Sequence, residues 1–190
     1  MINWNHKNIN IGGDKMAFVP VEDKLNKEKF KAVLSYIINR CENKPNVGKT
    51  LICKLLYFSD FNHYEIYEKS ITDETYLKYE HGPFPSRINE ILDEMIDEGS
   101  VEMRLEPYYT NTQNHYYLNN VPDLSLLNTD ELRVINSVID KISDWNARKA
   151  SNYSHGDLPW KIAEDNDELD YEYVFYRDPE YSVRDYGGEL

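Results

Sequence analysis

The sequence contains little that would support a disulfide-bonded, secreted or membrane-spanning protein. Its 190 residues include only two cysteines, Cys41 and Cys53, and both fall in helical patterns where a reduced cysteine packs as a small hydrophobe. No apolar run approaches the roughly 18 residues that a membrane helix needs, and the mean hydropathy is -0.71. The first 14 residues lack the apolar core of a signal peptide. We therefore expect a soluble, cytoplasmic protein with no membrane association.

Basic residues are also scarce. The chain has 21 Lys and Arg against 34 Asp and Glu, a net charge of -13, and from Ser154 onward 11 acidic residues face 3 basic ones. Proteins that bind nucleic acid usually carry a basic footprint, because phosphate neutralisation supplies most of their non-specific affinity. Nucleic acid is therefore not an expected partner. The acidity either steers the protein toward a basic partner or only keeps it soluble.

A complete nucleotide-binding motif is missing. Gly48-Lys49-Thr50 resembles the end of a phosphate-binding loop, but Asn43 stands where that motif needs its first glycine. The preceding segment has a helical pattern, whereas the motif follows a strand. The three residues are therefore expected to begin a helix.

No set of residues has the spacing of a catalytic or metal site. Asp60 and His63 lie three residues apart on a predicted helix and could supply half of an acid–base or metal site. The other candidates, His81, His115 and His155, are scattered without ligand-like spacing. We expect Asp60 and His63 to be structural hydrogen-bonding groups. The chain is thus predicted to be no enzyme and to hold no metal or cofactor.

Hydrophobic periodicity predicts a mainly helical α+β domain with a small antiparallel hairpin or sheet. Helical spacing covers residues 30–41, 51–66, 88–96 and 132–142, and Asn128 and Glu131 fit a capping box before the last of these. Alternation predicts a hairpin between 101–105 and 115–118, a short extended segment at 75–80 and a last strand at 171–175. Gly82 is expected to be extended before Pro83, in a rigid connection.

These patterns suggest a division into an arm at residues 1–22, a domain at 23–178 and a tail at 179–190. Met16 is a possible natural start of the chain. The order of three helices, a hairpin and a helix superficially resembles a winged-helix DNA reader. However, Arg87 is the only basic residue of the third helix, which also carries five acidic residues, so DNA binding through it is not expected.

Aromatic residues offer two candidate contact regions. Tyrosine gives rigid, amphipathic contact area and favours partner binding, although it is also an ordinary strand residue. Seven of the 16 tyrosines are predicted to bind a partner: Tyr108, Tyr109, Tyr116, Tyr117, Tyr171, Tyr173 and Tyr176. In the second region, Ser154 is expected to cap a short helix. There His155 and Trp160 either pack on the core or anchor an interface.

The combined motifs resemble the Panacea domain, also called the SocA-like antitoxin domain, over roughly residues 25 to 178. The matching elements are Lys54-Leu55-Leu56-Tyr57-Phe58-Ser59-Asp60, Ile71-Thr72, Tyr76, His81-Gly82-Pro83-Phe84-Pro85-Ser86, Ser154-His155, Trp160 and Asp170-Tyr171-Glu172. Lys69-Ser70 departs from the Gly-Arg-Pro that the family often has there. We expect the shared residues to form a scaffold, namely Leu55, Leu56, Tyr57, Asp60, Tyr76, His81, Gly82, Pro83, Pro85, Ser154, His155 and Trp160.

The resemblance implies an antitoxin of a type II-like toxin–antitoxin pair, of bacterial or phage origin, that neutralises a protein toxin by direct binding. Two alternatives remain open. One is an adaptor that delivers the toxin to an AAA+ protease, and the other is a DNA-binding autoregulator. Because many toxins act on RNA through basic sites, the acidic segment from Ser154 onward could cover such a site.

Overall fold

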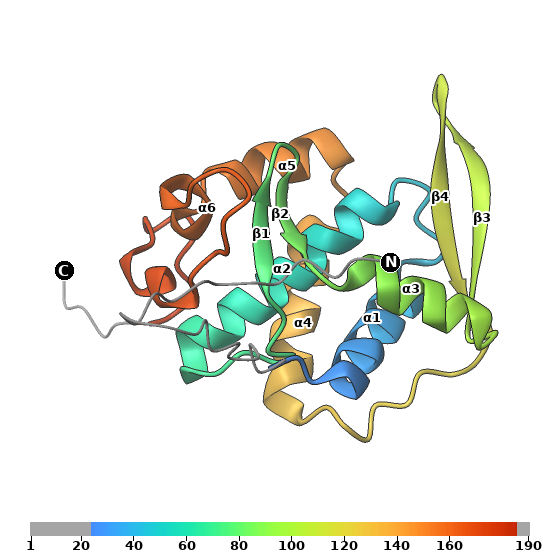
Figure 1. Ribbon diagram of the computed structural model, residues 1–190, viewed down its shortest axis with the longest axis horizontal. Helices are drawn as coiled ribbons and strands as arrows, with labels where there is room; N and C mark the ends of the chain where they lie inside the picture. Colours follow the sequence, from blue (N-terminus) through green and yellow to red (C-terminus); the bar gives the residue numbers. More distant parts are fainter. Residues whose placement is uncertain (1–23, 186–190) are drawn as a thin grey trace, which may run out of the picture.

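Residues 24–185 are described by a computed structural model (Figure 1), in which helices enclose one core and two hairpins flank it. The arm expected at residues 1–22, including Met16, lies outside the described residues. The elements are α1 (Lys27–Cys41), α2 (Lys49–Tyr67), β1 (Tyr76–Tyr79), β2 (Gly82–Pro85), α3 (Ile88–Asp97), β3 (Val101–Tyr108), β4 (Asn111–Leu118), α4 (Thr129–Ile142), α5 (Ala147–His155), α6 (Leu158–Ile162) and the 3₁₀ helix η1 (Tyr171–Tyr176). The predicted mainly helical α+β class is confirmed.

Helix α2 is the centre of the molecule. It contacts α1, α4, α5, β2 and η1, and Figure 1 shows these elements arranged around it. Its run from Leu51 to Phe61 is buried on every side, including the polar residues Lys54, Ser59 and Asp60. Apolar residues around the whole circumference are typical of a helix with no solvent face. The sequence therefore correctly places α2 in the core.

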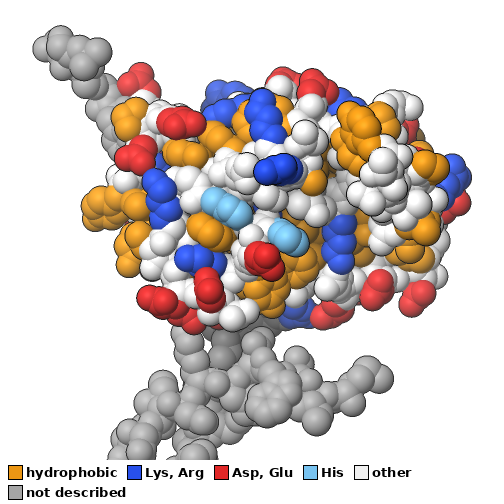
Figure 2. All heavy atoms as spheres, turned by 90° about the horizontal axis from the view of Figure 1, so that it is seen from above, with side chains coloured by type: hydrophobic (Ala, Val, Ile, Leu, Met, Phe, Trp, Pro, Cys, Tyr) orange, Lys and Arg blue, Asp and Glu red, His pale blue; other side chains and the backbone are white. Residues whose placement is uncertain are grey.

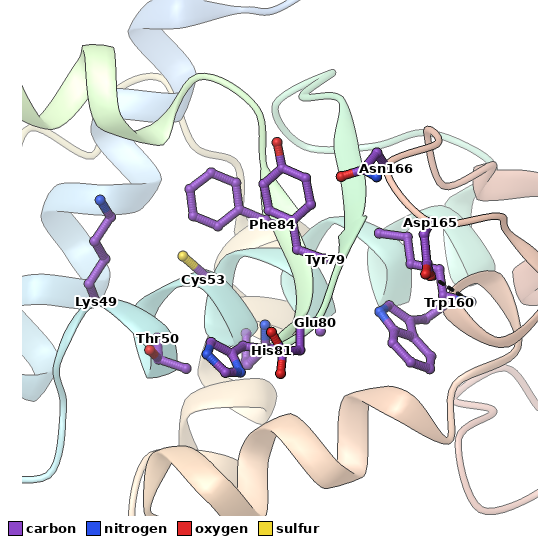
Figure 3. Close-up of a pocket in the computed structure, with 13 residues that line it drawn as sticks. Lys49, Thr50, Cys53, Tyr79, Glu80, His81, Phe84, Trp160, Asp165 and Asn166 are labelled. Atoms are coloured by element: carbon purple, nitrogen blue, oxygen red, sulfur yellow. Dashed lines mark ion pairs between the residues drawn. The ribbon is translucent and has the colours of Figure 1, made fainter.

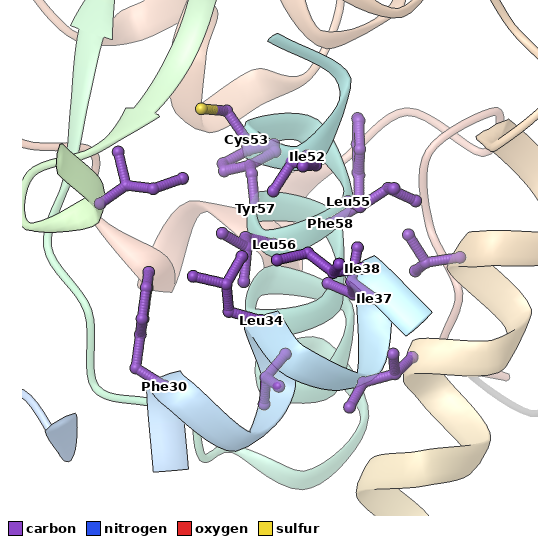
Figure 4. Packing of buried hydrophobic residues seen from close by; sticks show 14 of the residues in the cluster. Phe30, Leu34, Ile37, Ile38, Ile52, Cys53, Leu55, Leu56, Tyr57 and Phe58 are labelled. Carbon is purple, nitrogen blue, oxygen red and sulfur yellow. The ribbon is translucent and has the colours of Figure 1, made fainter. Parts of the chain in front are cut away.

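The core itself forms where α1 packs on α2. Figure 4 shows Leu34 and Ile37 of α1 beside the α2 residues Leu56 and Ile52, with Phe30 near the start of α1 in the same cluster, and all of these side chains are at most 1% exposed. The two cysteines belong to this cluster and are free and buried. Burial raises the pKa of each thiol to about 11, so both stay protonated and pack as hydrophobes.

Local signals set the limits of several helices. Asn128 and Glu131 form the expected capping box of α4, in which the Asn128 side chain accepts from the N–H groups of Asp130 and Glu131. Gly99, which follows α3, has φ +71°, a conformation that favours glycine. Gly48 precedes α2 as its N-cap, so Gly48-Lys49-Thr50 does begin a helix.

The two hairpins are separate two-stranded antiparallel sheets. Tyr79 pairs with Gly82 across the turn Glu80-His81, and Val101 pairs with Leu118 at the base of β3 and β4. Gly82 lies in strand β2, as the expected extended segment requires, but its φ of +94° was not predicted. A residue with positive φ after a tight turn lets the chain reverse between β1 and β2, and glycine adopts it most easily.

Two expectations for the C-terminal part are corrected. Residues 171–175 form part of a 3₁₀ helix, not a strand, because Tyr171, Val174 and Arg177 recur every three residues on the inner side. Ser154 lies inside α5, and Asp157 caps the next helix by accepting from the N–H of Leu158. Among residues 24–185, no helix is both long and apolar enough to cross a membrane.

Candidate functional site

Asp60 is a buried carboxylate that joins α2 to the segment before β1. It accepts hydrogen bonds from the N–H groups of Ile71 and Thr72, both at 2.9 Å, from Thr72 Oγ1 at 2.6 Å and from Tyr76 Oη at 2.7 Å. Burial raises the pKa of Asp60, and these four donors oppose that rise. The carboxylate is therefore used as an acceptor that holds the 70–76 segment on α2.

His63, one turn further along α2, is not paired with Asp60. Its Nδ1 instead contacts the carbonyl of Lys69 at 2.5 Å, and its ring lies 4.7 Å from that of Tyr67. Within the described part of the chain, no group of three or more His, Cys, Asp or Glu side chains is placed to hold a metal ion. Asp60 and His63 thus have separate hydrogen-bond partners.

A second buried network links α2 to the C-terminal part through Arg177. Its Nε and Nη2 donate to Oδ1 and Oδ2 of Asp157 at 2.8 and 2.6 Å, and its Nη1 donates to Glu65 at 2.8 Å. Tyr57 Oη completes the network by donating to Asp157 Oδ2 at 2.8 Å. The guanidinium thus neutralises two buried carboxylates, and the side chains of Arg177, Glu65 and Asp157 are all 0% exposed.

The β1–β2 hairpin packs closely against α2 and α5 at Gly82. A Cβ atom on Gly82 would lie 2.4 Å from Ser154 Oγ and 2.9 Å from Lys54 Nζ. Lys54 in turn donates to the carbonyl of Pro83 at 2.8 Å. The absence of a side chain at residue 82 is therefore needed both for the positive φ and for the approach of the hairpin to two helices.

A hollow of about 750 Å³ opens beside this hairpin. Its wall is made by the first turns of α2, by β1, β2 and their turn, and by α6 with the segment that follows it, as Figure 3 shows. The lining combines the aromatic side chains Tyr79, Phe84 and Trp160 with lysines and the turn residue His81. The hollow thus lies where the sequence motif around His81-Gly82-Pro83 meets α2.

His155 and Trp160 lie beside the hollow and stack on each other, with ring centroids 4.2 Å apart and planes 15° apart. Both are half-buried. Lys78 Nζ lies 4.4 Å from the centroid of the Trp160 ring. Within residues 24–185, the buried atoms His155 Nε2 and Trp160 Nε1 have no hydrogen-bond partner. Trp160 thus lines the hollow, and His155 packs against its ring.

Comparison with protein families gives one match, to the model "Antitoxin SocA-like, Panacea domain" over residues 52–161. The match covers more than half of the chain and spans α2 to α6. The chain belongs to the Panacea domain family. Comparisons with curated proteins and with solved structures found no match.

Most residues of the expected Panacea scaffold lie inside the domain. Nine of the twelve are buried: Leu55, Leu56, Tyr57, Asp60, Tyr76, Gly82, Pro83, Pro85 and Ser154. His155 and Trp160 are half-buried, and His81 is exposed at the turn of the β1–β2 hairpin. The motif thus combines core residues with a few that reach the hollow, and its scaffold role stays a prediction.

The seven tyrosines predicted to bind a partner do not form one surface. Four lie on the β3–β4 hairpin and three on η1, at opposite ends of the molecule (Figure 1). Tyr116 is only 5% exposed and belongs to the core. Tyr171 stacks on Phe61 at 4.1 Å and donates to the carbonyl of Glu74. Because their rings pack inside the Panacea domain, these two are removed from the candidates.

The β3–β4 hairpin carries exposed apolar side chains. It projects from the helical body in Figure 1, and Met103, Leu105 and Tyr109 are 42%, 66% and 90% exposed. Tyr109 also has φ 54°, which costs a non-glycine residue on the order of 1 kcal/mol. An exposed aromatic residue in a strained conformation at a hairpin tip contributes nothing to the core, so it is available for a contact.

Residues 164–180, which we name the acidic end, form the opposite surface. Eight acidic residues are exposed there: Glu164, Asp165, Asp167, Glu168, Asp170, Glu172, Asp178 and Glu180. Tyr173 and Tyr176 of η1 are exposed between them, by 41% and 73%. The left side of Figure 2 shows acidic and hydrophobic side chains together at this end. The acidic segment expected from the sequence thus exposes most of its carboxylates at this end.

Several residues that organise these sites could not be recognised from the sequence. Arg177, Glu65 and Glu74 are charged residues that are buried in the fold, and charged residues are usually exposed. Lys54 belongs to the family motif, and one feature of the sequence indicates its burial. It lies between Cys53 and Leu55 in a run that is apolar around the whole helix.

Proposed function

We propose that this Panacea domain is the antitoxin of a toxin–antitoxin pair and neutralises a protein toxin by direct binding. The observation that carries the proposal is the family match over residues 52–161. The arrangement of the described residues supports a binding protein, because its exposed features are an apolar hairpin and an acidic, tyrosine-bearing end.

We propose that the β3–β4 hairpin anchors the toxin. Anchoring residues at interfaces are typically aromatic side chains that become buried on binding, and Tyr109 is 90% exposed. Tyr108 lies against Tyr109 with ring centroids 4.8 Å apart, and Tyr117 is held by a hydrogen bond to Glu106. Tyr108, Tyr109 and Tyr117 therefore remain partner-binding candidates, and Met103 and Leu105 extend the apolar surface.

The acidic end has a different proposed role, which is to attract a basic partner. Like charges at one end of a molecule raise the association rate with an oppositely charged protein, and salt screens this effect. Tyr173 and Tyr176 provide contact area in the same place. A toxin that acts on RNA through a basic site has the charge that this surface attracts.

The experiment that tests the proposal is co-expression of the chain with the product of the adjacent gene. We expect that product alone to stop growth and the wild-type chain to restore it. Tyr109→Asn should weaken protection, because asparagine tolerates positive φ and keeps the turn but removes the ring. Val121→Ser is the matched control, since Val121 is 91% exposed but lies outside both surfaces.

The amount of toxin in the same cells separates neutralisation from delivery to a protease. Binding alone leaves the toxin level unchanged while growth recovers. A fall in toxin level that depends on an AAA+ protease would support the adaptor alternative. Absence of protection by the wild-type chain would contradict both.

A further inference from the structure

The hollow beside the β1–β2 hairpin has a charge opposite to that of the whole chain. Three lysines, Lys49, Lys54 and Lys78, line it in a protein with a net charge of -13. Figure 2 shows the face seen from above, where lysine and histidine side chains lie across the middle and most acidic side chains lie toward the edges. A general excess of acidic residues that keeps the protein soluble does not explain why lysines gather at this hollow.

Lys54 is the most unusual of the three lysines. It is 2% exposed, and its only hydrogen-bond acceptor among residues 24–185 is the carbonyl of Pro83 at 2.8 Å. No carboxylate of the described residues pairs with it. A buried ammonium group without a counter-charge is costly, and burial accordingly lowers the pKa of Lys54 to about 8. The hollow therefore has a cationic group in its wall that lacks a negative partner.

The surroundings of Lys54 do not supply that partner. Asp165 and Glu80 also line the hollow, but both are exposed at its rim, and Asp165 lies 4.0 Å from Lys78. Lys49 and Thr50 of the first turn of α2 also line the hollow, and this turn has neither an acidic residue nor a side-chain cap. The helix dipole of α2 adds to the positive potential.

The remaining wall determines which kind of anion fits. Cys53, Tyr79, Phe84 and Trp160 give the hollow apolar and aromatic sides, and Figure 3 shows the rings of Tyr79 and Phe84 on one side and Trp160 on another. No arginine lines the hollow, whereas phosphate sites commonly use arginine forks or nests of backbone N–H groups. A single carboxylate on an apolar body matches this lining better than a phosphate does.

We propose that the hollow binds an organic carboxylate, with the carboxylate group at Lys54 and its apolar or aromatic part against Tyr79, Phe84 and Trp160. The volume of about 750 Å³ lies in the range of small-molecule sites, which combine apolar walls with few polar groups. The carboxylate comes either from a free small acid or from the end of a polypeptide. The inference does not depend on toxin neutralisation, because the isolated protein is enough to test it.

The probe is 3-phenylpropanoate, and its neutral amide, 3-phenylpropanamide, is the matched control ligand. Titration calorimetry with the full chain should show that the carboxylate binds about tenfold or more tightly than the amide. Lys54→Met should remove this preference and leave binding of the amide unchanged. Lys141→Met is the control variant, since Lys141 lies on α4 with its ammonium over Tyr153, outside the hollow. Equal binding of the two ligands, or no binding of either at millimolar concentration, overturns the proposal.

A thermal melt shows whether Lys54→Met still folds. If it does not fold, the double variant Lys49→Met/Lys78→Met tests the proposal instead. We expect this variant to bind 3-phenylpropanoate about threefold more weakly and the amide with unchanged affinity. Unchanged affinity in that variant overturns the proposal. The source of the carboxylate is then distinguished by competition. Displacement of a bound partner protein by 3-phenylpropanoate indicates a polypeptide carboxylate, and undisturbed partner binding indicates a free acid.

Discussion

Arg177 and Asp157 form a two-pronged ion pair inside the protein, with N–O distances of 2.8 and 2.6 Å and no exposure of either side chain. Asp157 also caps α6, and Arg177 immediately follows η1. The pair therefore links α6 to η1, and the hydrogen bonds to Tyr57 and Glu65 link both elements to α2.

Replacement of Arg177 should strongly destabilise the fold. Arg177→Met leaves Asp157 buried without its cation and removes one partner of Glu65, and breaking such a buried pair typically costs about 3–5 kcal/mol. Urea denaturation measures this loss. Arg133→Met is the matched control, because Arg133 is 68% exposed and makes only exposed contacts among the described residues, to Asp130 and Tyr67, so a change within about 0.5 kcal/mol is expected. Similar stabilities of the two variants would show that the buried network is not needed.

Two glycines with positive φ make it possible to distinguish the cost of backbone strain from the cost of a steric clash. Gly82 and Gly99 have φ +94° and +71°, but a Cβ on Gly99 meets nothing within 4 Å, whereas one on Gly82 meets Ser154 and Lys54. Gly99→Ala should therefore cost about 1 kcal/mol from backbone strain alone. Gly82→Ala should cost about 1–3 kcal/mol more, measured as the free energy of unfolding. Equal losses would argue against close packing of the hairpin on α2 and α5.

Glu74 gives the fold a measurable pH dependence. It is 1% exposed, and burial raises its pKa from 4.5 to about 7. The unfolded chain releases the proton at lower pH than the folded chain, so stability is lost as pH rises from about 4.5 to about 7. Glu74→Gln removes this loss and keeps an acceptor for Ser86 and the N–H of Thr75.

The variant should be more stable than the wild type at pH 8, by up to about 3 kcal/mol, and about equally stable at pH 4. Denaturation curves at the two pH values provide the measurement. Asp93→Asn, which neutralises an exposed carboxylate on α3, should leave the wild-type pH profile unchanged. A stability difference between Glu74→Gln and wild type that is the same at both pH values would contradict the assignment.

The acidic end should control how fast the protein finds a basic toxin. Stopped-flow association should slow about tenfold when salt is raised from low to high concentration. The double neutralisation Asp167→Asn/Glu168→Gln should reduce that salt dependence, whereas Asp93→Asn/Asp97→Asn on α3 should not. Both pairs are exposed, so the two variants differ only in where on the surface the negative charges are removed. An association rate indifferent to salt would remove the electrostatic part of the proposed function.

Elements that depend on near neighbours in the chain could be predicted from the sequence. The capping box Asn128–Glu131 and the helical spacing of α1, α2 and α3 are local signals, and the structure has these helices. The aromatic and β-branched residues of Tyr-Glu-Tyr-Val-Phe are common in strands, but residues 171–175 belong to a 3₁₀ helix. Such a short segment is also compatible with the three-residue period of that helix, and η1 packs on α2.

The candidate sites were less predictable because they depend on residues far apart in the sequence. The partners of Arg177 in α2 lie 112 and 115 positions away, and nothing local distinguishes this arginine from an exposed one. The same holds for Tyr116 and Tyr171, whose burial depends on which face of the hairpin or of η1 meets the core. The family motif contains several residues that line the hollow, but it predicted neither the hollow nor the unpaired charge of Lys54 in its wall.

In the proposed function, this Panacea domain inhibits a toxin by binding to it directly. The most direct measurement is a titration of the purified toxin, its activity followed as the purified chain is added. We predict that activity falls in proportion to the added chain, reaches its minimum at a fixed molar ratio, and does so without cleavage of the toxin. Full toxin activity in the presence of a molar excess of folded chain would contradict the claim.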